Sequence, residues 1–229
     1  MADFTPFWIS IKVAVISTLI VTILGIFISK WLYQRNGVIG RILESIIVLP
    51  IVLPPTVMGF ILLIVFSPRS FVGQFFAEVL HLPVVFTLTG AVIASVIVSF
   101  PLMYQHTVQG FRGIDNKMLN TARTMGASEG KIFTKLVLPL SKRAILSGVM
   151  MSFARAIGEF GATLMVAGYI PNKTNTLPLE IYFLVEQGRE HQAWLWVLVL
   201  VAFAVTVIGT INILNLSLIH ISEPTRLRR

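Results

Sequence analysis

Long apolar stretches separated by short polar segments dominate the pattern along this chain. A helix needs about 20 mostly apolar residues to cross the hydrocarbon core of a bilayer. Five stretches meet this requirement, and they cover residues 7–29, 43–66, 83–105, 144–168 and 193–215. The pattern therefore predicts an all-α membrane protein, a bundle of five transmembrane helices.

Composition and charge agree with this prediction. The chain is 55% hydrophobic and only 12% charged, whereas a soluble domain carries roughly 25% charged residues. Much of the surface is therefore expected to face lipid. The net charge of +8 does not indicate nucleic acid, because the positive residues lie in the short connections where membrane topology places them.

Positive residues are distributed unevenly between the two sides of the predicted bundle. If the N-terminus lies outside, the cytoplasmic side holds Lys30, Arg35, Arg41, Arg112, Lys117, Arg123, Lys131, Lys135, Lys142 and Arg143. The outer side holds only Lys12, Arg69, Lys173 and Arg189. Since cytoplasmic loops carry an excess of Lys and Arg, we expect the N-terminus outside and the C-terminus in the cytoplasm.

The second stretch is interrupted by Pro50, Pro54 and Pro55. Proline removes a helix hydrogen bond, so this span is predicted to be kinked or locally broken. The freed backbone groups cannot face lipid and need other helices or a cavity. The span is therefore expected in the interior of the bundle, with Pro54, Pro55 and Thr56 as candidate pore-lining residues.

The fourth stretch contains two ionisable residues, Arg155 and Glu159. They are four residues apart and share one face of a continuous helix. An ion pair that holds the bundle together is the favoured interpretation. The alternative is a functional site, because charged residues inside a span often mark one, although Glu159 would neutralise much of the attraction of Arg155 for an anion.

The connection between the third and fourth stretches, from about Gln105 to Arg143, is long enough to have structure of its own. Asp115 is placed to cap a helix that runs from Asn116 to Met125. The apolar face predicted for this helix consists of Ile114, Met118, Ala122 and Met125.

Gly126 then supplies the left-handed residue that ends this first helix. Ser128 is placed to cap a second helix, which runs to about Val137 and is expected to stop at Pro139. Its apolar side would consist of Ile132, Phe133 and Leu136, with Lys131 and Lys135 pointing away. We call the segment Asp115–Pro139 the elbow. Its spacing alone fits equally a segment that lies on anionic lipid and one that docks into a partner.

The sequence of the elbow resembles the EAA loop of the permeases of ABC importers. The matching positions are Asn120, Thr121, Ala122, Gly126, Ala127, Ser128, Leu136, Leu138 and Pro139. The glycine and the Leu-Pro pair match in register, whereas Asn120 stands in place of the usual glutamate. In that family the loop forms coupling helices that sit in a cleft of the ATPase subunit, and the resemblance implies the same role here.

Three further segments, residues 49–59, 153–168 and 170–182, resemble the molybdate branch of the oxyanion permeases. The resemblance covers residues 1–215 and implies one permease domain of the MetI-like fold in the cell membrane of a bacterium. It also implies transport of molybdate, a second permease copy, a separate ATPase subunit and an extracytoplasmic molybdate-binding protein. The chain has no phosphate-cradling Gly-x-x-x-x-Gly-Lys loop, so ATP hydrolysis is expected in the partner.

Several alternatives remain open. The substrate could be sulfate or tungstate, and tungstate is close to molybdate in size and charge. An ion-coupled secondary transporter would use Arg155 and Glu159 as a relay, but such proteins usually have internal repeats and many spans. A further alternative is a membrane scaffold protein that does not transport, but this function does not account for the prolines or the elbow. No nucleophile motif or zinc-ligand spacing occurs, so no catalytic residue, metal or cofactor is predicted.

The last segment, residues 216–229, needs a separate interpretation. Its sequence from Leu216 to Arg226 resembles one reading frame of a common transposase sequencing adapter. We therefore expect this tail to be foreign to the protein and exclude it from the permease domain.

Overall fold

The computed structural model of the chain describes residues 4–35 and 37–220, with side chains described as far as residue 207 and at Gly209. Within this part of the chain the regular elements are helices, which confirms the predicted all-α fold. Three helices are long and apolar enough to cross a membrane, and the number rises to five if each of two bent helix pairs forms one span. The chain divides into two compact units, one up to Leu179 and one from Glu180 onward.

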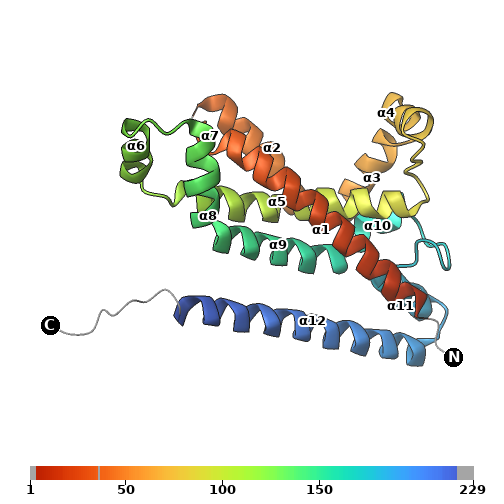
Figure 1. The fold of residues 1–229 in the computed structure, drawn as a ribbon. Coiled ribbons are helices and arrows are strands. Elements are labelled where there is room, and N and C mark those ends of the chain that lie inside the picture. The colour runs from red at the N-terminus through yellow and green to blue at the C-terminus, as the bar shows by residue number, and fades with distance from the viewer. Residues whose placement is uncertain (1–3, 36, 221–229) are drawn as a thin grey trace. The chain divides into compact units, whose positions relative to one another are not determined.

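Three helices form the centre of the first unit: α1 (Thr5–Leu32), α5 (Leu88–Arg112) and α9 (Lys142–Ile157). Each contacts the other two, and α5 and α9 lie side by side in Figure 1. Small residues permit this close packing. A methyl group added at Gly25 of α1 would lie 2.6 Å from Cγ of Met103, and one at Gly148 of α9 would lie 3.0 Å from its Sδ. Met103 of α5 is therefore enclosed between the other two helices.

Serine hydroxyls also join these three helices. Ser29 of α1 donates to the carbonyl of Tyr104 at 3.4 Å. Ser152 of α9 donates to the carbonyl of Ser99 at 3.3 Å. Because water is absent from the hydrocarbon core, backbone carbonyls serve as internal partners for these two buried hydroxyls. These contacts tie both α1 and α9 to the backbone of α5.

The second predicted span is broken, as its prolines predicted. It consists of α2 (Val38–Val52) and α3 (Pro55–Val65), whose axes differ in direction by 114°. The break falls at Leu53 and Pro54, both in extended conformation. Pro55 begins α3, where its missing N–H is not needed. The change of direction therefore occurs at the pair of consecutive prolines.

The fourth predicted span is not the single helix expected over residues 144–168. Helix α9 ends at Ile157, and a separate short helix α10 spans Gly161–Val166. The carboxylate of Glu159 accepts a hydrogen bond from the N–H of Ala162 and so starts the new helix. A side chain that caps a helix in this way offers the backbone an alternative to continuing the preceding helix.

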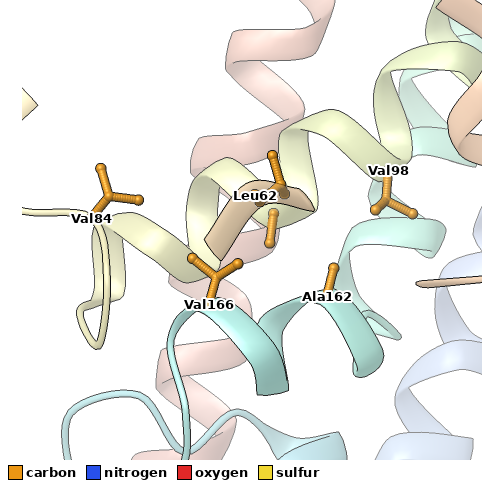
Figure 2. Close-up of a cluster of buried hydrophobic side chains, with 6 residues drawn as sticks. Leu62, Val84, Val98, Ala162 and Val166 are labelled. Carbon is orange, nitrogen blue, oxygen red and sulfur yellow. The ribbon is translucent and has the colours of Figure 1, made fainter. Parts of the chain in front are cut away.

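A buried apolar cluster joins the half-span α3 to α5 and α10 (Figure 2). It consists of Leu62, Val84, Ala94, Val98, Ala162 and Val166. The connection that leads from α3 to α5 contains α4 (Phe71–Gln74), which continues as a π-helical turn over Phe75–Val79. The end of this connection is fixed by the N–H of Phe86, which donates to the carbonyl of Val166 at 2.8 Å.

The second unit contains the end of α11 (Leu177–Glu186) and α12 (Glu190–His220). Gly188, with φ +71°, provides the left-handed residue between the two helices. The fifth predicted span, residues 193–215, lies within α12. Of the predicted foreign tail, residues 221–229 lie outside the described residues.

Candidate functional site

The first helix of the elbow is α6, which spans Asn116–Thr124. The carboxylate of Asp115 accepts a hydrogen bond from the N–H of Lys117 at 2.8 Å. This is the helix cap that the sequence predicted, and it satisfies one of the free N–H groups in the first turn.

The turn after α6 is built around Gly126, which has the predicted left-handed conformation, with φ +82°. Its N–H donates to the carbonyl of Arg123 at 2.9 Å, and the N–H of Ala127 donates to the carbonyl of Ala122 at 3.1 Å. These two bonds form a Schellman motif, which closes a helix and reverses the chain direction. The apolar contact typical of that motif is also present, because Ala122 and Ala127 pack against the same buried cluster.

The second helix of the elbow differs from the prediction at both ends. Ser128 lies at the cap position but its side chain makes no capping hydrogen bond. Helix α7 (Glu129–Ile132) widens into a π-helical turn over Phe133–Val137 and continues as α8 (Leu138–Leu140). The expectation that Pro139 stops the helix is therefore wrong. The wider turn lets the chain start a new helical segment in which proline occupies one of the first positions, where no N–H is required.

The buried side of the elbow packs against the ends of α1 and α5. Its cluster of buried residues is Phe111, Leu119, Ile132, Phe133 and Val137. The side predicted for the second helix is confirmed, since Ile132 and Phe133 are buried whereas Lys131 and Lys135 are exposed.

The apolar face predicted for the first elbow helix is partly wrong. Ile114 and Ala122 pack against the cluster, as expected. Met118 and Met125 instead point outward and are 46% and 82% exposed. Leu119, which was not in the predicted face, is buried in their place. The buried face differs from the predicted one because the short helix is oriented by its capping residues and by the cluster. Its own apolar spacing does not determine this orientation alone.

Aromatic rings connect the elbow to the two long helices beneath it. Phe133 of the elbow packs edge-on against Phe111 of α5, with ring centroids 5.5 Å apart. Phe111 packs in the same way against Tyr33, which follows α1, at 5.6 Å. The ammonium group of Lys30 lies 4.4 Å from the centre of the Phe133 ring. The second elbow helix is therefore in direct contact with α1 through Lys30 and with α5 through Phe111.

A polar network spans the turn of the elbow. The guanidinium of Arg123 forms an ion pair with Glu129, with Nε 2.6 Å from Oε1. It also donates to Oδ1 of Asn120 at 2.8 Å. Hydrogen bonds from Arg123 lower the pKa of Glu129, while the same bonds raise the pKa of Arg123. The pKa of the nearby Tyr33 is raised by burial and, to a smaller extent, by the charge of Glu129.

The residues of the EAA-like pattern fall into two groups. The exposed group contains Asn120, Thr121, Gly126, Ser128 and Pro139. The partly buried group contains Ala122, Ala127, Leu136 and Leu138, all of which pack against the cluster. The pattern therefore supplies both an outward surface and the apolar residues that hold this surface against the bundle.

A second ion pair lies on the same side of the first unit as the elbow. Arg112, the last residue of α5, pairs with Glu44 of α2. The same guanidinium donates from Nε to the carbonyl of Tyr33 at 3.5 Å. Sequence reasoning missed both this pair and the Arg123–Glu129 pair, because partners on different helices, or on either side of a turn, leave no periodic signal.

Arg155 and Glu159 come together at the break between α9 and α10. Their charged atoms are 2.7 Å apart, and Glu159 is almost completely buried whereas Arg155 is partly exposed. The second oxygen of Glu159 accepts from the N–H of Ala162 at 2.8 Å. The carboxylate therefore joins the last turn of α9 to the first turn of α10.

The two breaks in the spans lie against each other. A methyl group added at Gly161, the first residue of α10, would lie 3.0 Å from Cβ of Pro55 and 3.2 Å from the nitrogen of Thr56. The side chains of Pro54, Pro55 and Thr56 are all exposed. This arrangement places backbone without regular helical bonding at one location in the bundle, next to the Arg155–Glu159 pair.

Comparison with known proteins gives a consistent result. Residues 21–226 match the model of a family described as binding-protein-dependent transport system inner membrane component. A putative molybdenum transport system permease protein, YvgM of Bacillus subtilis (strain 168), is 44% identical over 201 residues, which are 88% of each chain. The molybdenum transport system permease protein ModB of Escherichia coli (strain K12) is 37% identical over 179 residues, 78% of each chain. ModB of Azotobacter vinelandii is 34% identical over 196 residues, 84% of this chain and 86% of the relative.

Proposed function

The chain belongs to the family of binding-protein-dependent transport system inner membrane components, and from this we propose that it is the permease subunit of an ATP-driven molybdate importer. The assignment of molybdate as the substrate rests on the similarity to permeases named for molybdenum transport. This similarity extends over most of both chains. The apolar helices and the two bent helix pairs provide the multi-pass membrane body that such a subunit needs.

The elbow is the surface through which ATP hydrolysis in the partner subunit is coupled to movement of the permease. ATP hydrolysis takes place in a separate ATPase subunit, and the elbow docks into it. The coupling loop is the segment that carries the family pattern. Its exposed members form the docking surface, namely Asn120, Thr121, Gly126, Ser128 and Pro139. Its partly buried members hold this surface against the bundle, namely Ala122, Ala127, Leu136 and Leu138. The support for this role is geometric, because the elbow is closed by its own hydrogen bonds and anchored on α1 and α5.

A second copy of the chain completes the pathway. Pro54, Pro55 and Thr56 are exposed at a break in which backbone groups lack regular helical partners. Such backbone is tolerated at membrane depth only where it is covered by protein or lines a water-filled cavity. Two permeases facing each other across these breaks would provide both conditions, with the anion passing between them after delivery by an extracytoplasmic binding protein.

The N-terminus lies outside and the C-terminus in the cytoplasm. This orientation places the elbow, with Lys117, Arg123, Lys131 and Lys135, on the side where positive residues are enriched in membrane proteins. It also places the elbow where an ATPase has access to ATP.

Transport follows from differential contacts in two states. ATP binding draws the two ATPase subunits together, and the elbows move with them. Because Phe133 contacts both Phe111 and Lys30, this movement displaces α5 and α1. The permease pair then changes from the inward-open to the outward-open conformation. ATP shifts the equilibrium only through its different affinity for the two states. The permease itself makes and breaks no covalent bond.

Reconstitution in lipid vesicles tests this proposal. The purified permease would be assembled with its ATPase, and a binding protein loaded with molybdate would be added on the side of the N-terminus. We expect ATP hydrolysis to increase and radiolabelled molybdate to cross the membrane. Hydrolysis that does not respond to the loaded binding protein, together with no transfer of molybdate, would refute the proposal.

A further inference from the structure

The polar network of the elbow connects its two helices across the turn. Arg123 lies in the last turn of α6, and Glu129 is the first residue of α7. Both nitrogens on one edge of the guanidinium contact the carboxylate, with Nε at 2.6 Å from Oε1 and Nη2 at 3.3 Å from Oε2. The third nitrogen donates to Asn120 at 2.8 Å. All three donor groups of the arginine are therefore used within the elbow.

Both elbow helices pack into the same buried cluster, and few other contacts set the angle between them. The Schellman motif fixes the end of α6 as far as Ala127, but Ser128 makes no capping bond to the start of α7. The ion pair connects the two helices at this gap. An isolated exposed ion pair contributes little stability, but a bidentate pair held in a network is more favourable.

The closed elbow presents two large apolar side chains, of which Met125 is the more exposed. Met125 immediately precedes the left-handed Gly126 and is 82% exposed, and Met118 on the same helix is 46% exposed. Thioether side chains are flexible and polarisable and adapt well to apolar surfaces of a partner. Opening the angle between α6 and α7 would move Met125 relative to the part of the elbow that is anchored on the bundle.

We propose that Arg123 and Glu129 are positioning residues that hold the elbow closed and thereby direct Met125 into an apolar pocket of the ATPase subunit. This inference rests on the proposed function and adds to it the contact that anchors the partner and the pair that orients this contact. Asn120, which stands where related loops carry glutamate, supports this arrangement as an internal partner of Arg123.

Binding of the detergent-solubilised permease to its purified ATPase subunit tests the proposal. We expect Glu129→Gln to weaken binding about two- to fivefold, the range that corresponds to an exposed ion pair. Combining Arg123→Glu with Glu129→Arg should restore most of the affinity, since the pair is rebuilt in the opposite order. Met125→Ala should weaken binding about tenfold, as expected for an anchoring contact. Lys131→Gln is the matched control, because Lys131 is an exposed charge on α7, and binding should stay unchanged.

The outcomes separate this inference from the proposed function. If the unmodified permease binds the ATPase but the charge exchange gives no recovery, the positioning role of the pair is overturned. If Met125→Ala binds as tightly as the unmodified chain, the anchoring role of Met125 is overturned. Failure of the unmodified permease to bind any ATPase would instead refute the proposed function itself.

Discussion

Two glycine-to-alanine substitutions in the elbow, each of which adds one methyl group, test how far its turn depends on the left-handed conformation of Gly126. A methyl group added at Gly126 or at Gly130 would meet no heavy atom within 4 Å, so neither substitution creates a clash. The two positions differ in backbone conformation, because Gly126 has φ +82° whereas Gly130 lies inside helix α7. Gly126→Ala should therefore destabilise the closed elbow by about 1–2 kcal/mol. Gly130→Ala should stabilise it by about 0.5–1 kcal/mol.

Hydrogen exchange of the elbow amides is the direct assay. The N–H groups of Gly126 and Ala127 are hydrogen-bonded to carbonyls of α6, so their exchange reports opening of the turn. We expect residues 126–127 to exchange roughly 5- to 30-fold faster in Gly126→Ala, the ratio that corresponds to about 1–2 kcal/mol. Exchange in Gly130→Ala should be unchanged or slower. Equal exchange in the two variants would refute the assignment of the turn to the left-handed conformation of Gly126.

The remaining predictions concern the ion pairs and the contact between the half-spans. Arg155→Ala should lower the melting temperature more than Arg155→Ala combined with Glu159→Ala, because a buried unpaired carboxylate costs about 3–5 kcal/mol; equal melting temperatures would contradict this. Gly59→Ala should also lower the melting temperature, since the methyl group would lie 2.8 Å from the backbone of α10, whereas Gly37→Ala, which has open space, should not. The pKa of Glu129 is lowered by its arginine partner, so the ion pair persists from about pH 8 to about pH 5 and binding of the ATPase should not change with pH through this pair. Binding should weaken only as the pH falls through that lowered pKa, where the carboxylate is protonated. Weakening already near neutral pH, absent in Glu129→Gln, would contradict the assignment.

The positions of the apolar helices and the elbow turn could be read from the sequence because each depends on local signals. Five apolar stretches located the helices, and consecutive prolines located the break between α2 and α3. Gly126 located the turn of the elbow, since few other residues adopt its conformation without strain. These features need no knowledge of what the segments pack against.

Features that depend on tertiary contacts were not predictable in the same way. The end of α9 at Ile157 depends on a carboxylate that caps the following helix. The continuation of the elbow past Pro139 depends on a widened turn, which has no clear sequence signal. The exposure of Met125 depends on the orientation of α6 against the bundle, and the periodicity of a helix of nine residues is too short to determine that orientation.

The central claim is that this chain moves molybdate with energy supplied by an ATPase subunit. Uptake of radiolabelled molybdate by cells that lack their own permease tests it most directly, with the companion ATPase and binding protein supplied and excess sulfate as competitor. We predict uptake that requires the ATPase and persists in the presence of sulfate. Uptake that proceeds without the ATPase would contradict the claim that this is an ATP-driven permease, and uptake abolished by sulfate would contradict the assignment of molybdate as substrate.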